Sequence, residues 1–269
     1  MKVIPVPVRD DNYAYVVVDT PSNSGVFIDP FTLSKVQSAA SSAGLSSVQG
    51  CITTHHHQDH SGGNGDFAKA YPKATIWAGS DTPVMNELVK DGSTFDIGES
   101  IKVKCYATPC HTQDSIAFFL EDKRDSVPEG EVKRAVFTGD TLFISGCGRF
   151  FEGTPEQMHT SLNKTLASLP GDTVVMCGHE YTRSNVAFSA GVLPDRPAIQ
   201  SLAEDLRNKR NNGVTTGVYT IADEKKHNVF MLVGDAEVQK KVGTEGKGEI
   251  ETMKVLRELK NAGKMMAQL

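Results

Sequence analysis

The amino-acid sequence predicts an α/β fold in which sheets are covered by helices, followed by a small and mainly helical domain. Two observations favour this class. Short runs rich in β-branched residues recur through the first two thirds of the chain with helical stretches between them, a pattern typical of sheets that are covered by helices. After about residue 181 these runs give way to amphipathic helical patterns. We therefore expect one domain over residues 1–180 and a helical domain over residues 181–269.

Each expected strand is a short apolar run that ends at a turn-forming residue or a polar cluster. Residues such as Asn12 and Gly25 separate the first runs. The expected strands are residues 3–6, 14–18, 26–28, 50–53, 74–77, 101–107, 116–120, 135–138 and 173–176, and the expected helices between them are 34–43, 66–70, 82–88 and 155–169. The charged segment 121–134 contains Pro128 and Gly130, so we expect an exposed hairpin or loop there.

The last third of the chain carries two amphipathic helical patterns. They cover residues 198–210 and 251–262, and the segment between them is rich in Gly, Thr and Lys. This tail is therefore expected to form a small domain of its own.

Composition and charge are those of an ordinary globular protein, and they exclude several classes. Of 269 residues, 39% are hydrophobic and 23% are charged, and the formal net charge is -5. This acidic balance lacks the basic surface that nucleic-acid binding requires, so we expect no nucleic-acid partner. No apolar run approaches the roughly 20 residues that span a bilayer, so we expect no membrane partner.

The two remaining observations concern the location of the protein. The first residues match neither a secretory signal nor a transit peptide, so the mature chain is expected to start at Met1. The five cysteines are odd in number and not closely paired, which is not the pattern of a disulfide framework. We expect a monomer in the reducing cytoplasm.

Side chains of the kind that bind metal ions follow four of the expected strands. The segment 54–60, THHHQDH, follows the strand at 50–53. His111, Asp140 and His179 each follow a further apolar strand. Four strands thus deliver metal-type ligands at their C-terminal ends.

The segment 54–60 can present its ligands together. Alternate side chains of an extended segment face the same way, so His55, His57 and Asp59 can share one face. The glycines that follow allow a tight turn, which would bring His60 alongside.

Imidazole and carboxylate groups together suit zinc, iron or manganese. Five histidines and two aspartates exceed what one tetrahedral ion accepts, so we expect two divalent metal ions, zinc first and iron or manganese as alternatives, that share one carboxylate. For any single histidine, a packed or exposed residue without a metal is the simpler interpretation, but seven ligand-type residues at strand ends argue against it. A non-catalytic structural site is a further alternative, although such sites are usually saturated by four protein ligands.

Two sets of motifs give the sequence a resemblance to a known family. The segment 54–60 with the three downstream ligand candidates resembles the metallo-β-lactamase superfamily. Within it, residues 145–154 (SGCGRFFEGT) and 177–182 (CGHEYT) are similar to glyoxalase II, the hydroxyacylglutathione hydrolases. The resemblance covers nearly the whole chain, and it implies a four-layer αβ/βα sandwich followed by an α-helical domain.

The resemblance also implies how the ligands are shared. The first metal ion would be held by His55, His57 and His111, the second by Asp59, His60 and His179, and Asp140 would bridge the two. Asp59 and Asp140 would thereby act in catalysis, whereas His56 would support the site without binding metal. A hydroxide held between two ions stays deprotonated near neutral pH and would attack a thioester carbonyl. The departing thiol has a pKa of about 8.5, so it can leave as a thiolate without a dedicated general acid.

The implied substrate is S-(2-hydroxyacyl)glutathione. The family hydrolyses S-D-lactoylglutathione to glutathione and D-lactate, the second step of methylglyoxal detoxification. The matching substrate-binding residues are Arg149, Phe151, Tyr181, Arg257 and Lys260. Phe151 stands where many relatives have tyrosine, and residues 113–115 stand where relatives often have a Gly-His pair. Without the resemblance, the basic pair in the last helix would be interpreted as a solvated face.

Other activities of the superfamily stay open at this point: an iron-dependent persulfide dioxygenase, a lactonase or a nuclease. The acidic balance opposes a nuclease, Asp59 with His179 favours two metal ions over one, and the helical tail favours glyoxalase II. Cys110, Cys147 and Cys177 lie near site segments, and we expect them to be small buried apolar residues and not thiolate ligands.

Overall fold

The computed structural model describes residues 1–80, 82, 84–208 and 210–269, and they form two compact units. Unit 1 comprises residues 1–107 and 114–139, and unit 2 comprises residues 108–113 and 140–269. The chain therefore passes from one unit to the other close to His111 and at Asp140. The domain division expected from the sequence, at residue 180, stays a prediction.

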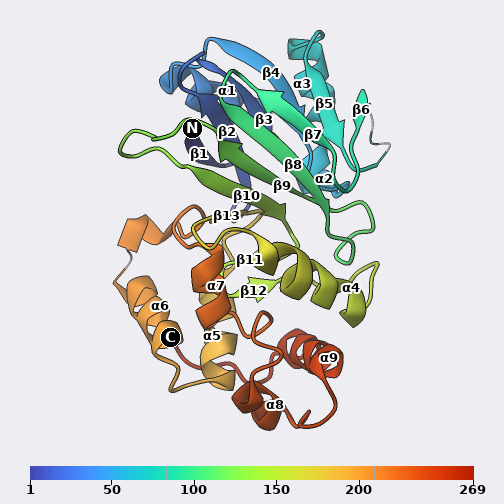
Figure 1. The fold of residues 1–269 in the computed structure, drawn as a ribbon, viewed down its shortest axis with the longest axis vertical. Helices are drawn as coiled ribbons and strands as arrows, with labels where there is room; N and C mark the ends of the chain where they lie inside the picture. The colour runs from blue at the N-terminus through green and yellow to red at the C-terminus, as the bar shows by residue number, and fades with distance from the viewer. Residues whose placement is uncertain (81, 83, 209) are drawn as a thin grey trace. The chain divides into compact units, whose positions relative to one another are not determined.

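The first sheet of unit 1 places its strands side by side in chain order (Figure 1). It consists of β1 (Lys2–Pro7), β2 (Tyr13–Asp19), β3 (Ser24–Ile28), β4 (Ser47–Ile52), β5 (Thr75–Ala78) and β6 (Glu87–Leu88). Pairing is antiparallel from β1 to β3 and parallel from β3 to β6. Parallel neighbours need crossover connections, and these are α1 (Leu33–Ser42) between β3 and β4, and α2 (Gln58–Ser61) with α3 (Asn64–Ala70) between β4 and β5.

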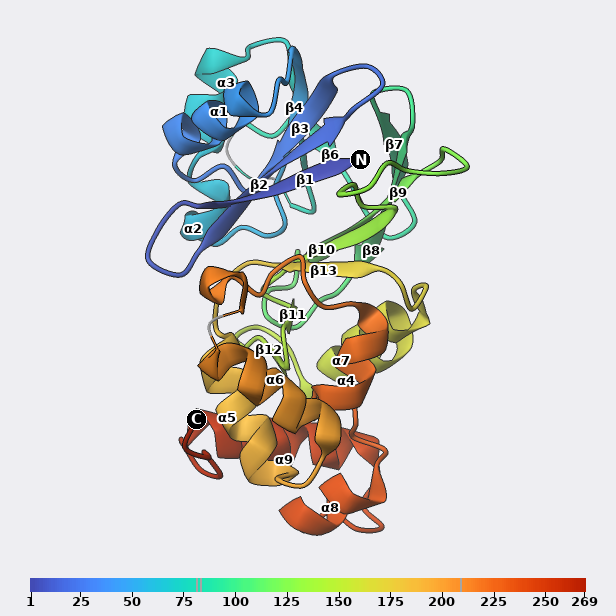
Figure 2. The same cartoon turned by 90° about the vertical axis from the view of Figure 1, so that its left-hand side faces the viewer.

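Both faces of this sheet are covered, which explains why every residue of β2 is buried. On one face, Val16 packs in a cluster with Val36 of α1 and Phe67 of α3. On the other face, Tyr15 meets Phe137 edge to face, with ring centroids 5.1 Å apart. Figure 2 shows α1 and α3 together on one side of β2, β3 and β4. The continuous apolar run along β2 thus packs against a helix layer on one face and a second sheet on the other.

The second sheet of unit 1 is antiparallel throughout. Its strands lie in the order β7 (Thr94–Ile97), β8 (Ile101–Ala107), β9 (Ile116–Asp122) and β10 (Arg134–Gly139). Residues 123–133 form the loop between β9 and β10, which confirms the prediction for this charged segment. The stacked rings of Trp77 and Phe95, 4.3 Å between centroids, pack β5 against β7.

Unit 2 is mainly helical. It contains the short strands β11 (Leu142–Phe143), β12 (Gly146–Cys147) and β13 (Val174–Cys177) and the helices α4 (Pro155–His159), α5 (Thr182–Val192), α6 (Pro197–Arg207), α7 (Ile221–His227), α8 (Ala236–Val242) and α9 (Glu249–Asn261). Capping boxes start α4 at Thr154 and α7 at Thr220, because each threonine side chain accepts a hydrogen bond from the backbone three residues on. The helix α9 packs on α4, and α5 packs on α6. The prediction of a helical tail is confirmed.

Several expected elements differ from the structure. The helix expected at 82–88 is wrong for residues 82 and 84–88, while residue 83 lies outside the described residues. Val84 has a φ of 62°, which a right-handed helix does not allow, and the side chain of Asn86 binds the backbone of Ile76 and Ala74. The helix expected at 198–210 ends at Arg207, and its residue 209 is not described. The expected helix at 155–169 continues beyond α4 only as a π-helical and then a 3-10 turn.

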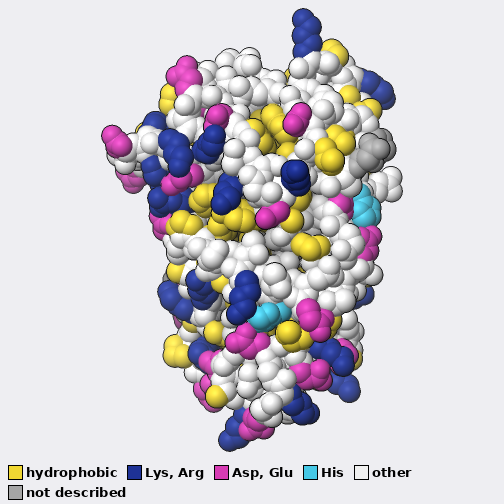
Figure 3. All heavy atoms as spheres, turned by 45° about the vertical axis from the view of Figure 1, so that its right-hand side comes forward, with side chains coloured by type: hydrophobic (Ala, Val, Ile, Leu, Met, Phe, Trp, Pro, Cys, Tyr) yellow, Lys and Arg dark blue, Asp and Glu magenta, His cyan; other side chains and the backbone are white. Residues whose placement is uncertain are grey.

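The surface mixes charges of both signs. On the face seen in Figure 3, Lys and Arg side chains are interspersed with Asp and Glu. Of the helices in the described ranges, none is long and apolar enough to cross a bilayer.

Replacing Phe67 by alanine should lower the free energy of unfolding by about 3 to 5 kcal/mol, since the fully buried ring leaves a cavity between Phe27 and Tyr71. Lys69→Ala, two residues on at an exposed position of α3, should change it by less than about 0.5 kcal/mol. Urea denaturation of both variants tests this. A loss below about 1 kcal/mol for Phe67→Ala would show that α3 does not anchor the sheet.

Candidate metal centre and substrate pocket

The loop after β4 and the short helix α2 carry the predicted ligands of unit 1. His55 and His60 are buried, and His57 is the N-cap residue that precedes α2. The imidazole rings lie together, with 4.8 Å between the centroids of His55 and His57 and 4.2 Å between those of His55 and His60. Unit 1 thus brings its predicted histidine ligands into one cluster.

A buried aspartate that the sequence analysis missed orients this cluster. Asp29 follows β3 directly and adopts a left-handed φ of 47°. Its carboxylate accepts hydrogen bonds from the backbone N–H of Thr54 at 2.8 Å, from the Thr54 hydroxyl at 2.7 Å and from Nδ1 of His60 at 2.8 Å. The signal was present in the sequence, because Asp29, like the predicted ligands, stands at the C-terminal end of a strand.

These bonds set which nitrogen of each ring can bind a metal. The Thr54 hydroxyl donates to Asp29, so its oxygen accepts from Nδ1 of His55, 3.1 Å away. A proton on Nδ1 puts the lone pair of His55 on Nε2, which lies 3.1 Å from Nδ1 of His57. The same argument puts the lone pair of His60 on Nε2, 3.7 Å from a carboxylate oxygen of Asp59. Nitrogen lone pairs that point toward each other or toward a carboxylate suit a cation.

His56 points to a different partner. Its Nδ1 lies 2.7 Å from a carboxylate oxygen of Asp114, whose other oxygen accepts from the hydroxyl of Ser80 at 2.7 Å. Asp114 therefore gives His56 a hydrogen-bond partner, which fits the supporting role expected for this residue.

Unit 2 brings together His111, Asp140 and His179. One carboxylate oxygen of Asp140 lies 3.4 Å from Nε2 of each histidine. These separations exceed the usual length of an N–H···O hydrogen bond, and they fit ligand atoms grouped around a cation. Nδ1 of His111 donates to the backbone carbonyl of Arg149 at 3.0 Å, which again puts the lone pair on Nε2.

Two glycines make room for these groups. Gly139, which precedes Asp140, has a φ of +47°, and a Cβ there would lie 2.6 Å from the Thr54 hydroxyl. A Cβ on Gly148 would lie 1.9 Å from the backbone carbonyl of Asp140. Any larger residue at position 148 would displace the backbone beside His111 and Asp140.

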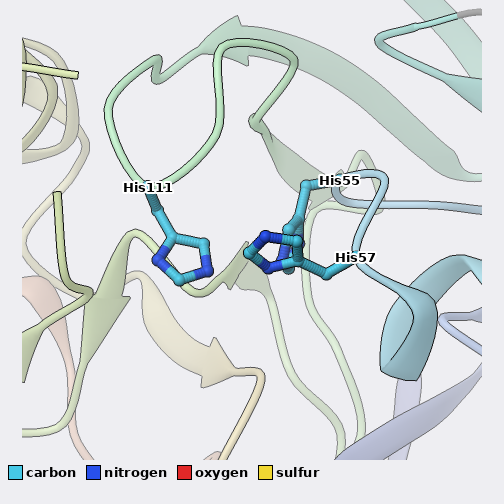
Figure 4. A group of neighbouring side chains, drawn as sticks. All are labelled: His55, His57 and His111. Carbon is cyan, nitrogen blue, oxygen red and sulfur yellow. The ribbon is translucent and has the colours of Figure 1, made fainter. Parts of the chain in front are cut away.

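Three groups of described residues could each hold a metal ion, because the ligand atoms of each group lie within 4.8 Å of one another: His55, His57 and His111; His55, His60 and Asp140; Asp59, His60 and His179. Figure 4 draws the first, with His55 and His57 from the loop after β4 and His111 from the loop after β8. Imidazole nitrogen with carboxylate oxygen is the donor chemistry for divalent metal ions.

The cysteines do not add to this donor set. All five are free and buried. Burial raises the pKa of Cys110 and of Cys177 to about 12 and also raises the pKa of Cys147. These groups therefore stay as neutral thiols at neutral pH, as expected for small apolar core residues.

A pocket of about 480 Å³ in unit 2 opens beside two of the ligand candidates. Its lining includes His111 and Asp140 together with all the predicted substrate-binding residues: Arg149, Phe151, Tyr181, Arg257 and Lys260. Residues of the pocket that the sequence analysis did not single out include Phe143, Asn185 and Met266. Nothing in their spacing along the chain marks them, because α5 and the segment after α9 reach the pocket only through folding.

The pocket lining includes two basic side chains, the buried Arg257 and the half-buried Lys260. Arg257 donates to the backbone carbonyl of Cys147 at 3.0 Å and lies over the ring of Phe230. Its Nε has no hydrogen-bond partner within the part of the chain that the structure describes. Lys260 donates to Asn185, and burial together with the charge of Arg257 lowers its pKa to about 7. Two crowded, incompletely neutralised cations favour an anionic ligand.

Aromatic rings cover the histidines of unit 2. Tyr181 stacks on His179 with 4.8 Å between ring centroids and an interplanar angle of 2°. Phe151 lies 5.2 Å from His111, and 60% of its surface is exposed. Both rings line the pocket and present apolar surface to whatever occupies it.

Comparison with known proteins places this geometry in a family. Residues 8–179 match the model of the metallo-β-lactamase superfamily, and residues 180–263 match that of the hydroxyacylglutathione hydrolase C-terminus. "Probable hydroxyacylglutathione hydrolase glo2" of Schizosaccharomyces pombe is 42% identical over 94% of each chain. "Hydroxyacylglutathione hydrolase cytoplasmic" of Arabidopsis thaliana is 38% identical over 97% of this chain and 98% of the relative.

Solved structures agree on the fold. ETHE1 from Myxococcus xanthus superimposes with a TM-score of 0.64 at 23% identity, covering 98% of this chain and 99% of that one. The BLEG-1 B3 metallo-β-lactamase gives a TM-score of 0.59 at 17% identity over 85% of this chain and 99% of that one. The predicted fold class is thereby confirmed, and the sequence relatives narrow the family: the chain belongs to the hydroxyacylglutathione hydrolases of the metallo-β-lactamase superfamily.

Proposed function

We propose that this protein hydrolyses S-(2-hydroxyacyl)glutathione, with S-D-lactoylglutathione as substrate and glutathione and D-lactate as products. This is the second step of methylglyoxal detoxification. The observation that carries the proposal is the pocket of unit 2, in which Arg257 and Lys260 share one cavity with His111 and Asp140. The names of the relatives, hydroxyacylglutathione hydrolases of similar length, support it.

The proposed cofactor is a pair of divalent metal ions, with zinc as the first candidate and iron or manganese as alternatives. His55, His57 and His111 would hold one ion, Asp59, His60 and His179 would hold the other, and Asp140 would be shared. When bound, such a pair supplies a nucleophile from water near neutral pH and positive charge at the carbonyl oxygen. The Nδ1 hydrogen bonds of His55, His60 and His111 support this assignment, because they direct Nε2 toward the cation.

The residues of the pocket would bind and orient the thioester. Glutathione carries carboxylates at both ends, and the guanidinium of Arg257 with the ammonium of Lys260 offers a matching anion site. The aromatic rings of Phe151 and Tyr181 lie over His111 and His179, where they would exclude water from the reacting acyl group. Binding of a carboxylate of glutathione by Arg257 and Lys260 would thus orient the substrate in the pocket.

The leaving group explains why the site needs no dedicated acid. A thiol has a pKa of about 8.5, so it departs as a stable thiolate near neutral pH. The buried cysteines near the pocket stay as thiols and take no part in this step. We place the reaction in the cytoplasm, an assignment that the name of the Arabidopsis relative supports.

The fully active protein should contain two metal ions per chain, and Asp140→Asn should lose at least one of them and more than about a hundredfold of kcat, because a shared charge is removed. Elemental analysis and the hydrolysis of S-D-lactoylglutathione measure both quantities. The control is Asp195→Asn, an exposed aspartate of unit 2. Full metal content with normal turnover in Asp140→Asn would reject Asp140 as the shared ligand.

The double variant Arg257→Ala, Lys260→Ala should raise KM for the glutathione thioester roughly ten- to a hundredfold, as expected for lost charge-assisted contacts of about 1.5 to 3 kcal/mol. The effect on kcat should be much smaller. A thioester of the same acid with mercaptoethanol, which lacks the peptide, should be hydrolysed equally by both proteins. Lys240→Ala, Lys241→Ala on the exposed side of α8 is the matched control. An unchanged KM would mean that the basic pair does not bind the peptide.

The KM of the glutathione thioester should rise with pH above about 7. Lys260 has its pKa lowered to about 7 by burial and by Arg257, so the ammonium that binds the anion is lost as pH rises through this value. Lys260→Arg, which stays charged, should flatten the profile between pH 6 and 9. A wild-type KM that is constant over this range would contradict the role of Lys260.

A further inference from the structure

Helix α7 buries a carboxyl group beneath the turn between β11 and β12. Glu224 is completely buried, and its Oε2 accepts hydrogen bonds from the backbone N–H of Ser145 at 2.9 Å and from the side-chain amide of Asn228 at 2.8 Å. Burial raises the pKa of Glu224 to about 8, so the group is mainly protonated at neutral pH. A buried polar side chain with such specific partners is costly to retain, which calls for a reason beyond packing.

The turn that Glu224 contacts has a strained backbone. Ser145 has a left-handed φ of 56°, which costs a residue other than glycine free energy unless the surroundings hold it. Its hydroxyl lies 2.9 Å from that of Ser189 and donates to the backbone carbonyl of His227. Asn228 also donates to the carbonyl of Gly146 at 3.0 Å. Glu224 and the backbone carbonyl of His227 in α7, with Asn228 just after the helix, therefore hold this turn in place.

The residues that follow the turn touch the proposed ligands and the pocket. The carbonyl of Cys147 accepts from Arg257, and the carbonyl of Arg149 accepts from Nδ1 of His111. Between them, Gly148 packs against the backbone of Asp140. A shift of the turn would move both carbonyl acceptors, and with them an imidazole and a guanidinium.

We propose that Glu224 is a positioning residue for the hydrolysis: it holds the turn at Ser145 so that the carbonyls of Cys147 and Arg149 orient Arg257 and His111. This inference rests on the proposed function, since it takes His111 as a metal ligand and Arg257 as a substrate-binding residue. Glu224 touches neither the substrate nor a metal ligand, and its effect passes through the backbone.

Two replacements of Glu224 separate positioning from simple packing. Gln has the same shape and keeps an oxygen that accepts from Ser145 and Asn228, whereas Leu has a similar volume and accepts nothing. We expect Glu224→Gln to behave as the wild type. Glu224→Leu should lose metal to EDTA about tenfold faster or more, as metal sites do when ligand orientation is lost. It should also raise KM for S-D-lactoylglutathione about tenfold while changing KM for the mercaptoethanol thioester far less.

The matched control is Thr220→Ala at the start of the same helix. It removes the capping box of α7 without touching the turn. If α7 contributes only to stability, then Glu224→Leu and Thr220→Ala should lose metal at the same rate and have the same KM when each variant is measured at the same number of degrees below its own Tm. That result would overturn the proposal.

A second variant covers the case in which Glu224→Leu does not fold. Asn228→Ala removes the amide that donates to Glu224 and to Gly146, and it should show the same pair of changes at smaller size. Wild-type metal retention and KM in Asn228→Ala would contradict the inference. If the wild-type protein failed to hydrolyse the glutathione thioester at all, the proposed function would fall, while the loss of metal to EDTA would still report whether Glu224 positions His111.

Discussion

One buried carboxylate organises the ligand segment of unit 1. The carboxylate of Asp29 accepts hydrogen bonds from the backbone N–H and the hydroxyl of Thr54 and from Nδ1 of His60. A buried carboxylate without partners would cost several kcal/mol, and three converging donors offset that cost. Because Thr54 in turn accepts from His55, a single charge fixes the ring orientation of two histidines. The left-handed backbone of Asp29 is the local strain that this arrangement tolerates.

In unit 2, a neutral acceptor orients the histidine. The carbonyl of Arg149 accepts a hydrogen bond from Nδ1 of His111, and the position of that carbonyl depends on the tight turn at Ser145 and on the missing side chain of Gly148. In both units, the ring nitrogen that would face a metal ion is selected by what the other ring nitrogen binds. The orientation of each predicted ligand ring is thus set by the hydrogen bond that its other nitrogen makes.

The pocket of unit 2 places two basic side chains, Arg257 and Lys260, in one cavity with His111 and Asp140. Burial and, to a smaller extent, the charge of Arg149 lower the pKa of Arg257, and burial together with the charge of Arg257 lowers the pKa of the half-buried Lys260. Such an arrangement weakens the folded state and strengthens the binding of an anion, a trade that is common at binding sites. Phe151 contributes to the pocket lining a ring without a hydroxyl, so under the proposed function recognition at this position would depend on apolar contact and on the two basic side chains.

The sequence by itself determined the chemistry of the site and most of the elements that carry it. Metal-type ligands stand at strand ends in local motifs, so their identity follows from the order of residues, and the apolar run of β2 and the amphipathic pattern of α9 are likewise local features of the sequence. Whether each residue takes its predicted role as a ligand or substrate contact stays a prediction. Only the tertiary structure decided which groups orient the predicted ligands: Asp29, the carbonyl of Arg149 and the turn at Ser145 are brought there by contacts between residues up to 82 positions apart. It also replaced the expected helix, over residues 84–88, by a turn at Val84 and the short strand β6, because Asn86 there completes the edge of a sheet that local propensity does not register.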